Sequence, residues 1–209
     1  MNEKMVRIIA VPLLIFTFSS TLAFATQDVE EKIKGKKVVM IIASRNFRDE
    51  ELQIPKNILE KEGVEVKIAS SSKDVATGML GATVKPDLLI NEIKVKEYEA
   101  IIFVGGTGAS SYWNDPVAHF IAQEAIKESK ILCAICIAPV TLANAGVLKG
   151  KKATVWPTEQ HRLKAKGALY TGKKVEVDGN IITASGPQAA EEFGKAIVKA
   201  LIGADQPSK

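Results

Sequence analysis

Short continuous apolar runs alternate along the chain with longer segments in which apolar and polar residues are mixed. The continuous runs predict strands buried on both faces of a sheet, and they cover residues 38–43, 100–104 and 131–135. The mixed segments predict helices and cover residues 49–62, 116–130, 139–145, 159–166 and 187–202. Strands that alternate with helices predict an α/β fold with a mainly parallel sheet, which binds ligands at the carboxyl ends of its strands.

Shorter apolar segments complete this pattern. The remaining predicted strands cover residues 64–69, 82–90 (broken by Pro86), 153–155, 175–177 and 181–184. Asp178-Gly179-Asn180 lies between the last two segments and is a turn signal, so we expect these two strands to form a hairpin.

The first residues have the three parts of a secretory signal peptide. Lys4 and Arg7 are basic, residues 8–18 are mainly apolar, and Ala23-Phe24-Ala25 has small residues at the two positions that a signal peptidase reads. We therefore predict cleavage after Ala25 and an exported protein, periplasmic or secreted, without stable membrane association after cleavage. The apolar run is shorter than a membrane span of about 20 residues, which makes an uncleaved anchor the weaker alternative.

The rest of the chain is predicted to form one domain. We assign residues 1–25 to the signal peptide, 26–36 to a charged linker, 37–203 to the α/β domain and 204–209 to a tail. The chain has 209 residues, of which 46% are hydrophobic, and this suits a single domain with a full core.

Charge and motif content exclude several function classes. The 28 basic and 24 acidic residues give a net charge of +4, but the lysines are scattered and no aromatic residues lie among them. We therefore expect no nucleic-acid partner. No residues have metal-ligand spacing and no phosphate-binding loop occurs, so we expect neither a metal nor a cofactor.

Cys136 is the residue that carries the strongest chemical signal. It follows the apolar run 131–135 and precedes Ala138 and Pro139, so the strand must turn sharply into a helix at this cysteine. Such a corner holds a residue in a strained conformation with an exposed side chain, and the following helix N-terminus lowers the pKa of a thiol. The alternative is a buried, inert cysteine.

Cys133 is expected to be a small core residue rather than a disulfide partner of Cys136. The strand between them spans roughly 10 Å, whereas a disulfide needs Cα atoms within about 7 Å. The two cysteines are the only ones in the chain.

Other candidates also follow predicted strands. Glu51 begins a helix, where it is either a surface charge or a carboxyl that exchanges a proton with Cys136. Gly105 and Gly106 offer backbone N–H groups to an oxyanion or only make a turn. His161 is the histidine that can reach the site as a base, while the other histidine is expected at the surface.

Several segments together resemble the ThiJ/PfpI (DJ-one/PfpI) family of the class I glutamine amidotransferase-like superfamily. They are ELQIP at 51–55, the strand and glycines at 101–106, AICIAP at 134–139, AGVLKGKKA at 145–153 and VDGNIIT at 177–183. The resemblance covers about residues 36–202. It implies a flavodoxin-like three-layer sandwich with a nucleophile elbow, usually in a homodimer or larger homo-oligomer.

The resemblance also implies roles for individual residues. Cys136 would be the nucleophile, Glu51 the carboxylate beside it, and Gly105, Gly106 and Ile137 the backbone donors of an oxyanion pocket. The sequence departs from the family at both usual histidine positions, which hold Ile137 and Trp156. Trp156 and His161 are further candidates for the pocket.

The remaining Cys136–Glu51 dyad implies cofactor-free glyoxalase III or deglycase chemistry on a small carbonyl such as methylglyoxal. A non-enzymatic alternative is an oxidative-stress sensor or chaperone that acts through oxidation of Cys136. A cysteine peptidase or amidase is the weakest alternative, because its base would have to be His161.

Overall fold

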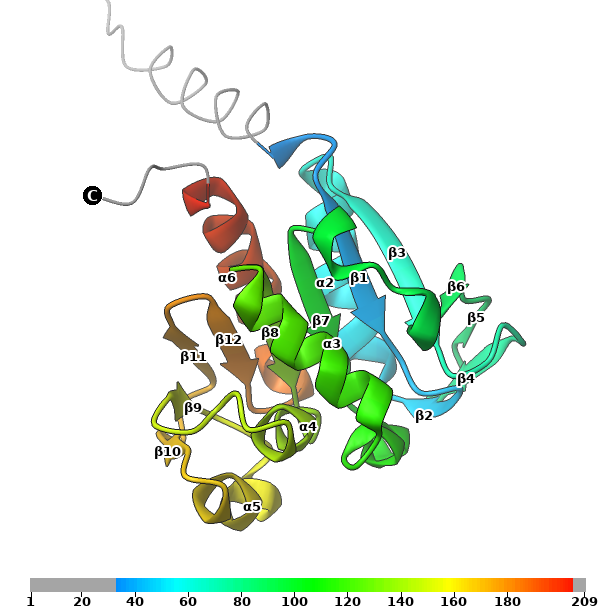
Figure 1. The fold of residues 1–209 in the computed structure, drawn as a ribbon. Coiled ribbons are helices and arrows are strands. Elements are labelled where there is room, and N and C mark those ends of the chain that lie inside the picture. The colour runs from blue at the N-terminus through cyan, green and yellow to red at the C-terminus, as the bar shows by residue number, and fades with distance from the viewer. Residues whose placement is uncertain (1–32, 205–209) are drawn as a thin grey trace, which may run out of the picture.

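A seven-stranded sheet forms the centre of the protein in the computed structural model, which describes residues 33–204 (Figure 1). The strand order is β11-β12-β8-β7-β1-β3-β6, and every neighbouring pair is parallel except β11 and β12. The strands are β1 (Lys37–Ile41), β3 (Glu65–Ser70), β6 (Leu88–Leu89), β7 (Ala100–Phe103), β8 (Ile131–Ile135), β11 (Val175–Asp178) and β12 (Ile181–Ala184). The predicted parallel sheet and the C-terminal hairpin are therefore confirmed.

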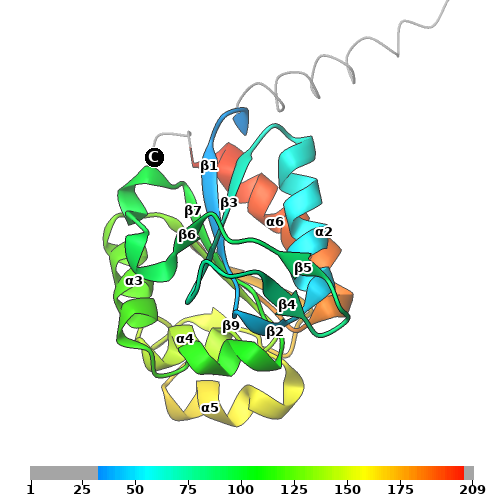
Figure 2. The same ribbon diagram turned by 90° about the vertical axis from the view of Figure 1, so that its right-hand side faces the viewer.

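Helices cover both faces of this sheet. Figure 2 shows the sheet between two helical layers, with α2 and α6 on one side and α3 on the other. The α-helices are α2 (Asp49–Lys61), α3 (Pro116–Lys127), α4 (Pro139–Asn144), α5 (Gln160–Ala165) and α6 (Ala190–Gly203). The 3-10 helices are η1 (Ile90–Glu92), η2 (Val95–Glu97), η3 (Thr107–Tyr112), η4 (Pro157–Glu159) and η5 (Pro187–Ala189). This arrangement is the expected flavodoxin-like three-layer sandwich.

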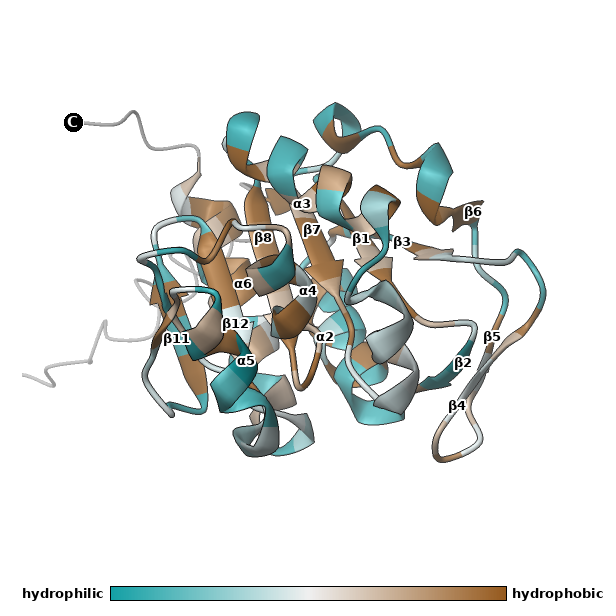
Figure 3. Ribbon diagram, turned by 60° about the horizontal axis from the view of Figure 1, so that its bottom comes forward, coloured by the Kyte–Doolittle hydropathy of each residue, from teal (hydrophilic) through white to brown (hydrophobic). Residues whose placement is uncertain are grey.

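Side chains of the central strands enter two separate apolar cores. In β1, Val39 and Ile41 pack into the core beneath α3 and α4, whereas Val38 and Met40 pack into the core beneath α2 and α6. Figure 3 shows the resulting colouring, with apolar central strands between helices that combine apolar and polar residues. Because successive side chains of a strand point to opposite faces, a strand covered on both sides must be apolar throughout.

A small sheet beside the main one was not predicted. It contains β2 (Arg45–Phe47), β4 (Ala76–Gly78) and β5 (Thr83–Val84), in the order β2-β4-β5. Asp49 holds the turn between β4 and β5, because its carboxylate accepts hydrogen bonds from the N–H groups of Leu80 and Ala82, both at 2.8 Å. Gly78 makes this possible, since a Cβ there would lie 2.5 Å from an oxygen of Asp49.

A second small sheet lies near the C-terminal part of the chain. The predicted short strand at 153–155 is displaced to β9 (Lys152–Ala153), which pairs with β10 (Leu169–Tyr170), a strand that was not predicted. The predicted strand excursion at 82–90 consists of β5 and β6, with Pro86 between them.

Two predicted boundaries differ from the structure. The helix expected to reach residue 130 ends at Lys127, because Ser129 has a positive φ of 55° that turns the chain into β8. The expected linker 26–36 is also too long, since Ile33 is fully buried and the N–H of Gly35 donates to the carbonyl of Gly63 at 2.9 Å. The expected signal peptide, the linker up to residue 32 and the tail beyond residue 204 lie outside the described residues.

Candidate active site

Cys136 lies on the corner where β8 turns into α4. Its φ is 63°, and Pro139 is the first residue of α4. Left-handed backbone costs a non-glycine residue about 1–2 kcal/mol and persists only where the surroundings hold it. Here the N–H of Cys136 donates to the carbonyl of Ala184 at 2.9 Å, and its carbonyl accepts from the N–H of Trp156 at 2.8 Å. The predicted nucleophile-elbow geometry is therefore present.

The side chain of Cys136 is more buried than predicted. Only 9% of the residue is exposed, and burial together with the adjacent charge of Glu51 raises the thiol pKa to about 12. The prediction of a lowered thiol pKa was wrong, because burial and the charge of Glu51 outweigh the backbone N–H groups that lower it. Cys133 is fully buried in β8 and both cysteines are free, as expected.

Glu51 is completely buried in the first turn of α2 and faces Cys136. Burial raises the pKa of its carboxyl to about 8, although the Cys136 thiol, the Arg48 charge and the Gly105 N–H partly oppose this effect. Neither carboxyl oxygen has a well-formed hydrogen bond to a described residue. Gly105 leaves the space for this contact, since a Cβ there would overlap the carboxyl of Glu51 and lie 2.5 Å from the Cβ of Cys136.

Cys136 and Glu51 form what we call the buried pair, and they titrate together. With a pKa of about 8, the carboxyl is protonated at neutral pH. Loss of one proton leaves a single negative charge, which can lie on the carboxylate or on the sulfur while the carboxyl donates its proton to it. The form with its charge on the sulfur is the one that can attack an electrophile.

Two backbone N–H groups stabilise negative charge on the sulfur. Those of Gly106 and Ile137 act on the Cys136 thiol and lower its pKa. The role of Gly105 differs from the predicted one. Its N–H lowers the pKa of Glu51 instead of that of the thiol, and its carbonyl accepts from the N–H of Arg48 at 3.0 Å. The structure therefore brings two of the three predicted backbone donors to the sulfur.

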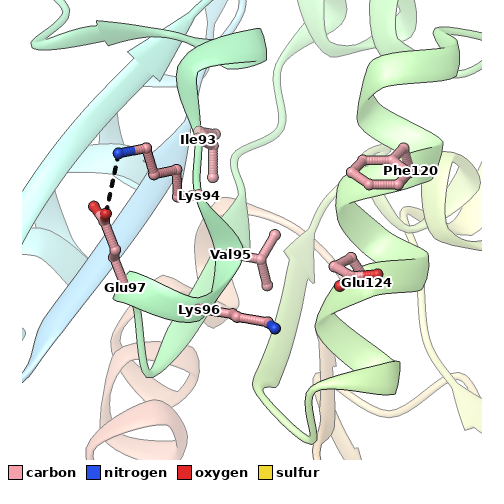
Figure 4. A pocket seen from close by; sticks show the side chains of 7 residues that line it. All are labelled: Ile93, Lys94, Val95, Lys96, Glu97, Phe120 and Glu124. Atoms are coloured by element: carbon pink, nitrogen blue, oxygen red, sulfur yellow. Dashed lines mark ion pairs between the residues drawn. The ribbon is translucent and has the colours of Figure 1, made fainter.

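The buried pair lines a pocket of about 260 Å³. The other side chains around it are mostly apolar, with a few polar groups, and they belong to Arg48, Met79, Thr107, Ile137, Trp156, Pro187 and Gln188. A larger hollow of about 460 Å³ lies between η2 and α3 (Figure 4), but it contains no cysteine and shares no lining residue with the pocket of the buried pair.

Arg48 is a pocket residue that was not predicted. Its guanidinium is held by Glu50, with Nε donating to Oε2 at 2.7 Å and Nη2 donating to Oε1 at 3.0 Å. Its position in the sequence could have indicated this role, because Arg48 immediately precedes the helix that begins with Asp49 and contains Glu51.

The histidines lie away from the pocket. His161 was a candidate lining residue, but its ring is exposed on α5, with Nδ1 3.0 Å from the carbonyl oxygen of Thr158, and it does not line the pocket. This expectation is corrected because α5 buries Leu163 and leaves its polar face outside. His119 on α3 has Nε2 2.8 Å from the carbonyl oxygen of Trp113.

Two tryptophans support the walls of the site. Trp156 lines the pocket as expected and packs closely on Gly186, where a Cβ would lie 2.7 Å from its ring. Trp113 donates from Nε1 to the carbonyl of Ile137 at 3.1 Å, and Arg162 lies over its ring at 4.6 Å. Trp113 thereby holds the residue that follows Cys136.

Residues 33–204 lack the features of a metal site and of a membrane-spanning helix. That part of the chain contains no group of three or more histidine, cysteine or carboxylate side chains arranged to hold a metal ion. None of its helices combines the length and apolar character required to cross a membrane.

Comparisons with known proteins agree with the fold. The DJ-1/PfpI family model matches residues 36–200. The chain is 38% identical over 200 residues to an uncharacterized protein of Methanocaldococcus jannaschii. The alignment covers 94% of this chain and 98% of that protein. It is 33% identical over 163 residues to the deglycase PfpI of Pyrococcus furiosus, with coverage of 78% and 98%.

A more distant relative and a solved structure extend the comparison. The glutathione-independent glyoxalase of Caenorhabditis elegans is 26% identical over 171 residues, with coverage of 82% of this chain and 91% of the relative. The ThiJ/PfpI domain protein from Brachyspira murdochii has a TM-score of 0.78 at 32% identity, covering 80% of this chain and 97% of that chain. This chain therefore belongs to the DJ-1/PfpI family.

Proposed function

We propose that this protein is a cysteine-dependent enzyme that acts on small reactive carbonyls, of the cofactor-free glyoxalase or deglycase type. Relatives named deglycase and glyoxalase support such an activity at the level of the family. The observation that carries the proposal is the buried pair itself: a thiol and a carboxyl of raised pKa side by side in one small pocket.

The first step is addition of sulfur to an aldehyde. The Cys136 thiolate attacks the aldehyde carbon of methylglyoxal, and the carbonyl oxygen takes the proton from the Glu51 carboxyl. The N–H groups of Gly106 and Ile137 lie at the sulfur and stabilise the oxyanion that forms next to it. The product is a hemithioacetal, and Glu51 is left as a carboxylate.

The second step moves a proton between two carbons. The Glu51 carboxylate takes the proton from the former aldehyde carbon and returns it to the neighbouring ketone carbon, while the hydroxyl proton of the hemithioacetal passes to the ketone oxygen. The first carbon is oxidised to a thioester and the second is reduced to an alcohol, so the oxidation and reduction balance within the substrate. Water then hydrolyses the thioester, releasing lactate and the free thiol.

The test is formation of lactate from methylglyoxal by the purified protein without glutathione. We expect Cys136→Ser to abolish the reaction and Glu51→Gln to slow it at least about 100-fold, the usual contribution of a positioned acid–base group. Cys133→Ala is the matched control, because this cysteine is fully buried on the strand that leads to Cys136 and does not line the pocket. Unchanged turnover by Cys136→Ser would refute the proposal.

A second candidate function is sensing of oxidants through Cys136. The observation that favours it is the protonated Glu51 carboxyl, which can donate a hydrogen bond to a sulfinate at Cys136. Mild peroxide should then add two oxygen atoms to Cys136 and none to Cys133, as measured by mass spectrometry of peptides. Preferential oxidation of Cys133 would contradict this candidate.

Peptidase or amidase activity is not favoured. The base that such a mechanism needs was expected to be His161, and His161 does not line the pocket of Cys136. A His161→Ala variant is expected to keep full activity toward methylglyoxal.

We also propose export by residues 1–25 and assembly into a homodimer or larger homo-oligomer. The N-terminal sequence pattern supports export, and membership of the family supports assembly. Sequencing of the mature N-terminus should find Thr26 first, and light scattering should give at least twice the mass of one chain. An intact N-terminus would contradict cleavage, and the mass of a single chain would contradict assembly.

A further inference from the structure

Arg48 places a cation on the wall of the pocket that contains the buried pair. Its side chain is partly exposed, and Glu50 fixes the guanidinium through Nε and Nη2. Nη1 makes no hydrogen bond to any residue in the described part of the chain. A guanidinium that is held on one edge and has unused N–H groups on another is prepared to bind a planar anion.

The remaining lining of the pocket does not oppose an anion. Glu51 is protonated at neutral pH, and Glu50 does not line the pocket. Among the described lining residues, Arg48 is therefore the charged side chain at neutral pH. The Arg48–Glu50 ion pair reduces the net charge, so Arg48 acts through directed hydrogen bonds more than through a long-range field.

The shape of the pocket limits the ligand to a small one. Its volume of about 260 Å³ is below the range of drug-sized pockets, which is about 300–1,000 Å³. Met79, Ile137, Trp156 and Pro187 supply apolar walls, which suit a short chain of methylene groups. The pocket thus offers a reactive sulfur, an apolar lining and a cation within one small volume.

We infer that Arg48 is a specificity-determining residue, and that the preferred substrates are 2-oxoaldehydes carrying a carboxylate at the far end of the molecule. This inference rests on the proposed function and adds the substrate class. The probe is 4,5-dioxopentanoate, in which two methylene groups separate the oxoaldehyde from the carboxylate. Its aldehyde carbon is oxidised to a carboxylate, its ketone is reduced to an alcohol, and one water is consumed to give 2-hydroxypentanedioate.

The first experiment compares kcat/KM for 4,5-dioxopentanoate with kcat/KM for methylglyoxal. We expect the wild type to prefer the anionic substrate and Arg48→Gln to lower the ratio at least about tenfold, mainly through KM, as expected for loss of a charge-assisted hydrogen bond. Arg48→Lys should keep most of the preference. Any effect of Arg48 on the reactivity of the buried pair cancels in the ratio of the two kcat/KM values, because both substrates react with that pair.

Arg45→Gln is the matched control. It makes the same change of charge on the same segment, but Arg45 is exposed and does not line the pocket. We expect Arg45→Gln to leave the ratio of the two substrates unchanged. An Arg48→Gln ratio equal to that of the wild type, or a wild-type preference for methylglyoxal, would overturn the inference.

A second experiment does not depend on turnover. Levulinate and its methyl ester share one skeleton and differ in charge, and each is tested for protection of Cys136 against iodoacetamide. We expect levulinate to protect at lower concentration, and Arg48→Gln to remove the difference. If neither aldehyde is turned over but levulinate still protects through Arg48, the proposed function fails and the anion site stands. Equal protection by the two compounds would refute the anion site, even in an active enzyme.

Discussion

Replacing Glu51 by glutamine is expected to make the folded protein more stable at neutral and mildly alkaline pH. The carboxyl has an ordinary pKa of 4.5, and burial raises it to about 8 in the folded protein. Between these two values the unfolded chain ionises Glu51 and the folded protein does not, so unfolding releases a proton. The contribution of Glu51 to stability is therefore largest below pH 4.5 and is lost as the pH rises through the folded pKa.

The size of this effect follows from the two pKa values. Each pH unit between them costs about 1.4 kcal/mol, which amounts to about 3 kcal/mol at pH 7 and about 5 kcal/mol above pH 8. Glutamine has nearly the same shape and cannot ionise, but its amide lacks good partners in a buried site and costs about 1–3 kcal/mol. We therefore expect Glu51→Gln to gain about 2 kcal/mol near pH 8 and to lose about 1 kcal/mol near pH 5.

Urea unfolding followed by tryptophan fluorescence from about pH 5 to 8.5 measures this difference. Glu60→Gln is the matched control, because Glu60 lies on the same helix but is exposed and pairs with Lys56 at 2.6 Å. The free energy of unfolding should fall with pH in the wild type and in this control, and stay nearly flat in Glu51→Gln. Parallel curves for all three proteins would show that Glu51 is not neutral in the folded state.

Three further substitutions test the surroundings of the site. Gly105→Ala inserts a Cβ into the buried pair, so we expect a loss of about 1–3 kcal/mol in urea unfolding and loss of turnover, whereas Gly203→Ala, which meets open space, should change neither. Trp113→Phe keeps an aromatic ring but removes the N–H that donates to the carbonyl of Ile137, so turnover should fall severalfold with a stability loss of only about 1 kcal/mol by thermal unfolding. Unchanged turnover would exclude a positioning role. Asp49→Asn weakens two hydrogen bonds to the β4–β5 turn, so amide hydrogen exchange in that turn should accelerate. Unaltered exchange would show that the Asp49 carboxylate does not hold the turn.

The main sheet was predictable because its strands are covered on both faces. The runs at 38–43, 100–104 and 131–135 are apolar at every position, and each overlaps an observed strand that pairs at the centre of the sheet. The corner at Cys136 was predictable for a local reason, since a buried strand followed closely by Ala138 and Pro139 leaves few residues for the turn.

Features that depend on distant contacts were not predictable in this way. The strands β2 and β4 are short and carry no periodic pattern, and their turn is held by Asp49, which is remote in sequence. The burial of Cys136 and the raised pKa of Glu51 arise from packing between α2, β8 and the loop after β7. Arg48 becomes a pocket residue only through this packing.

The backbone contacts of Cys136 also determine when this cysteine can become reactive. The N–H of Cys136 donates to the carbonyl of Ala184, the last residue of β12. The carbonyl of Cys136 accepts from the N–H of Trp156, which precedes η4. Both partners are synthesised well after the cysteine itself. We therefore expect a nascent or truncated chain without β12 to carry an ordinary thiol on an unconstrained turn, and Cys136 to become reactive only when the C-terminal part of the domain has folded.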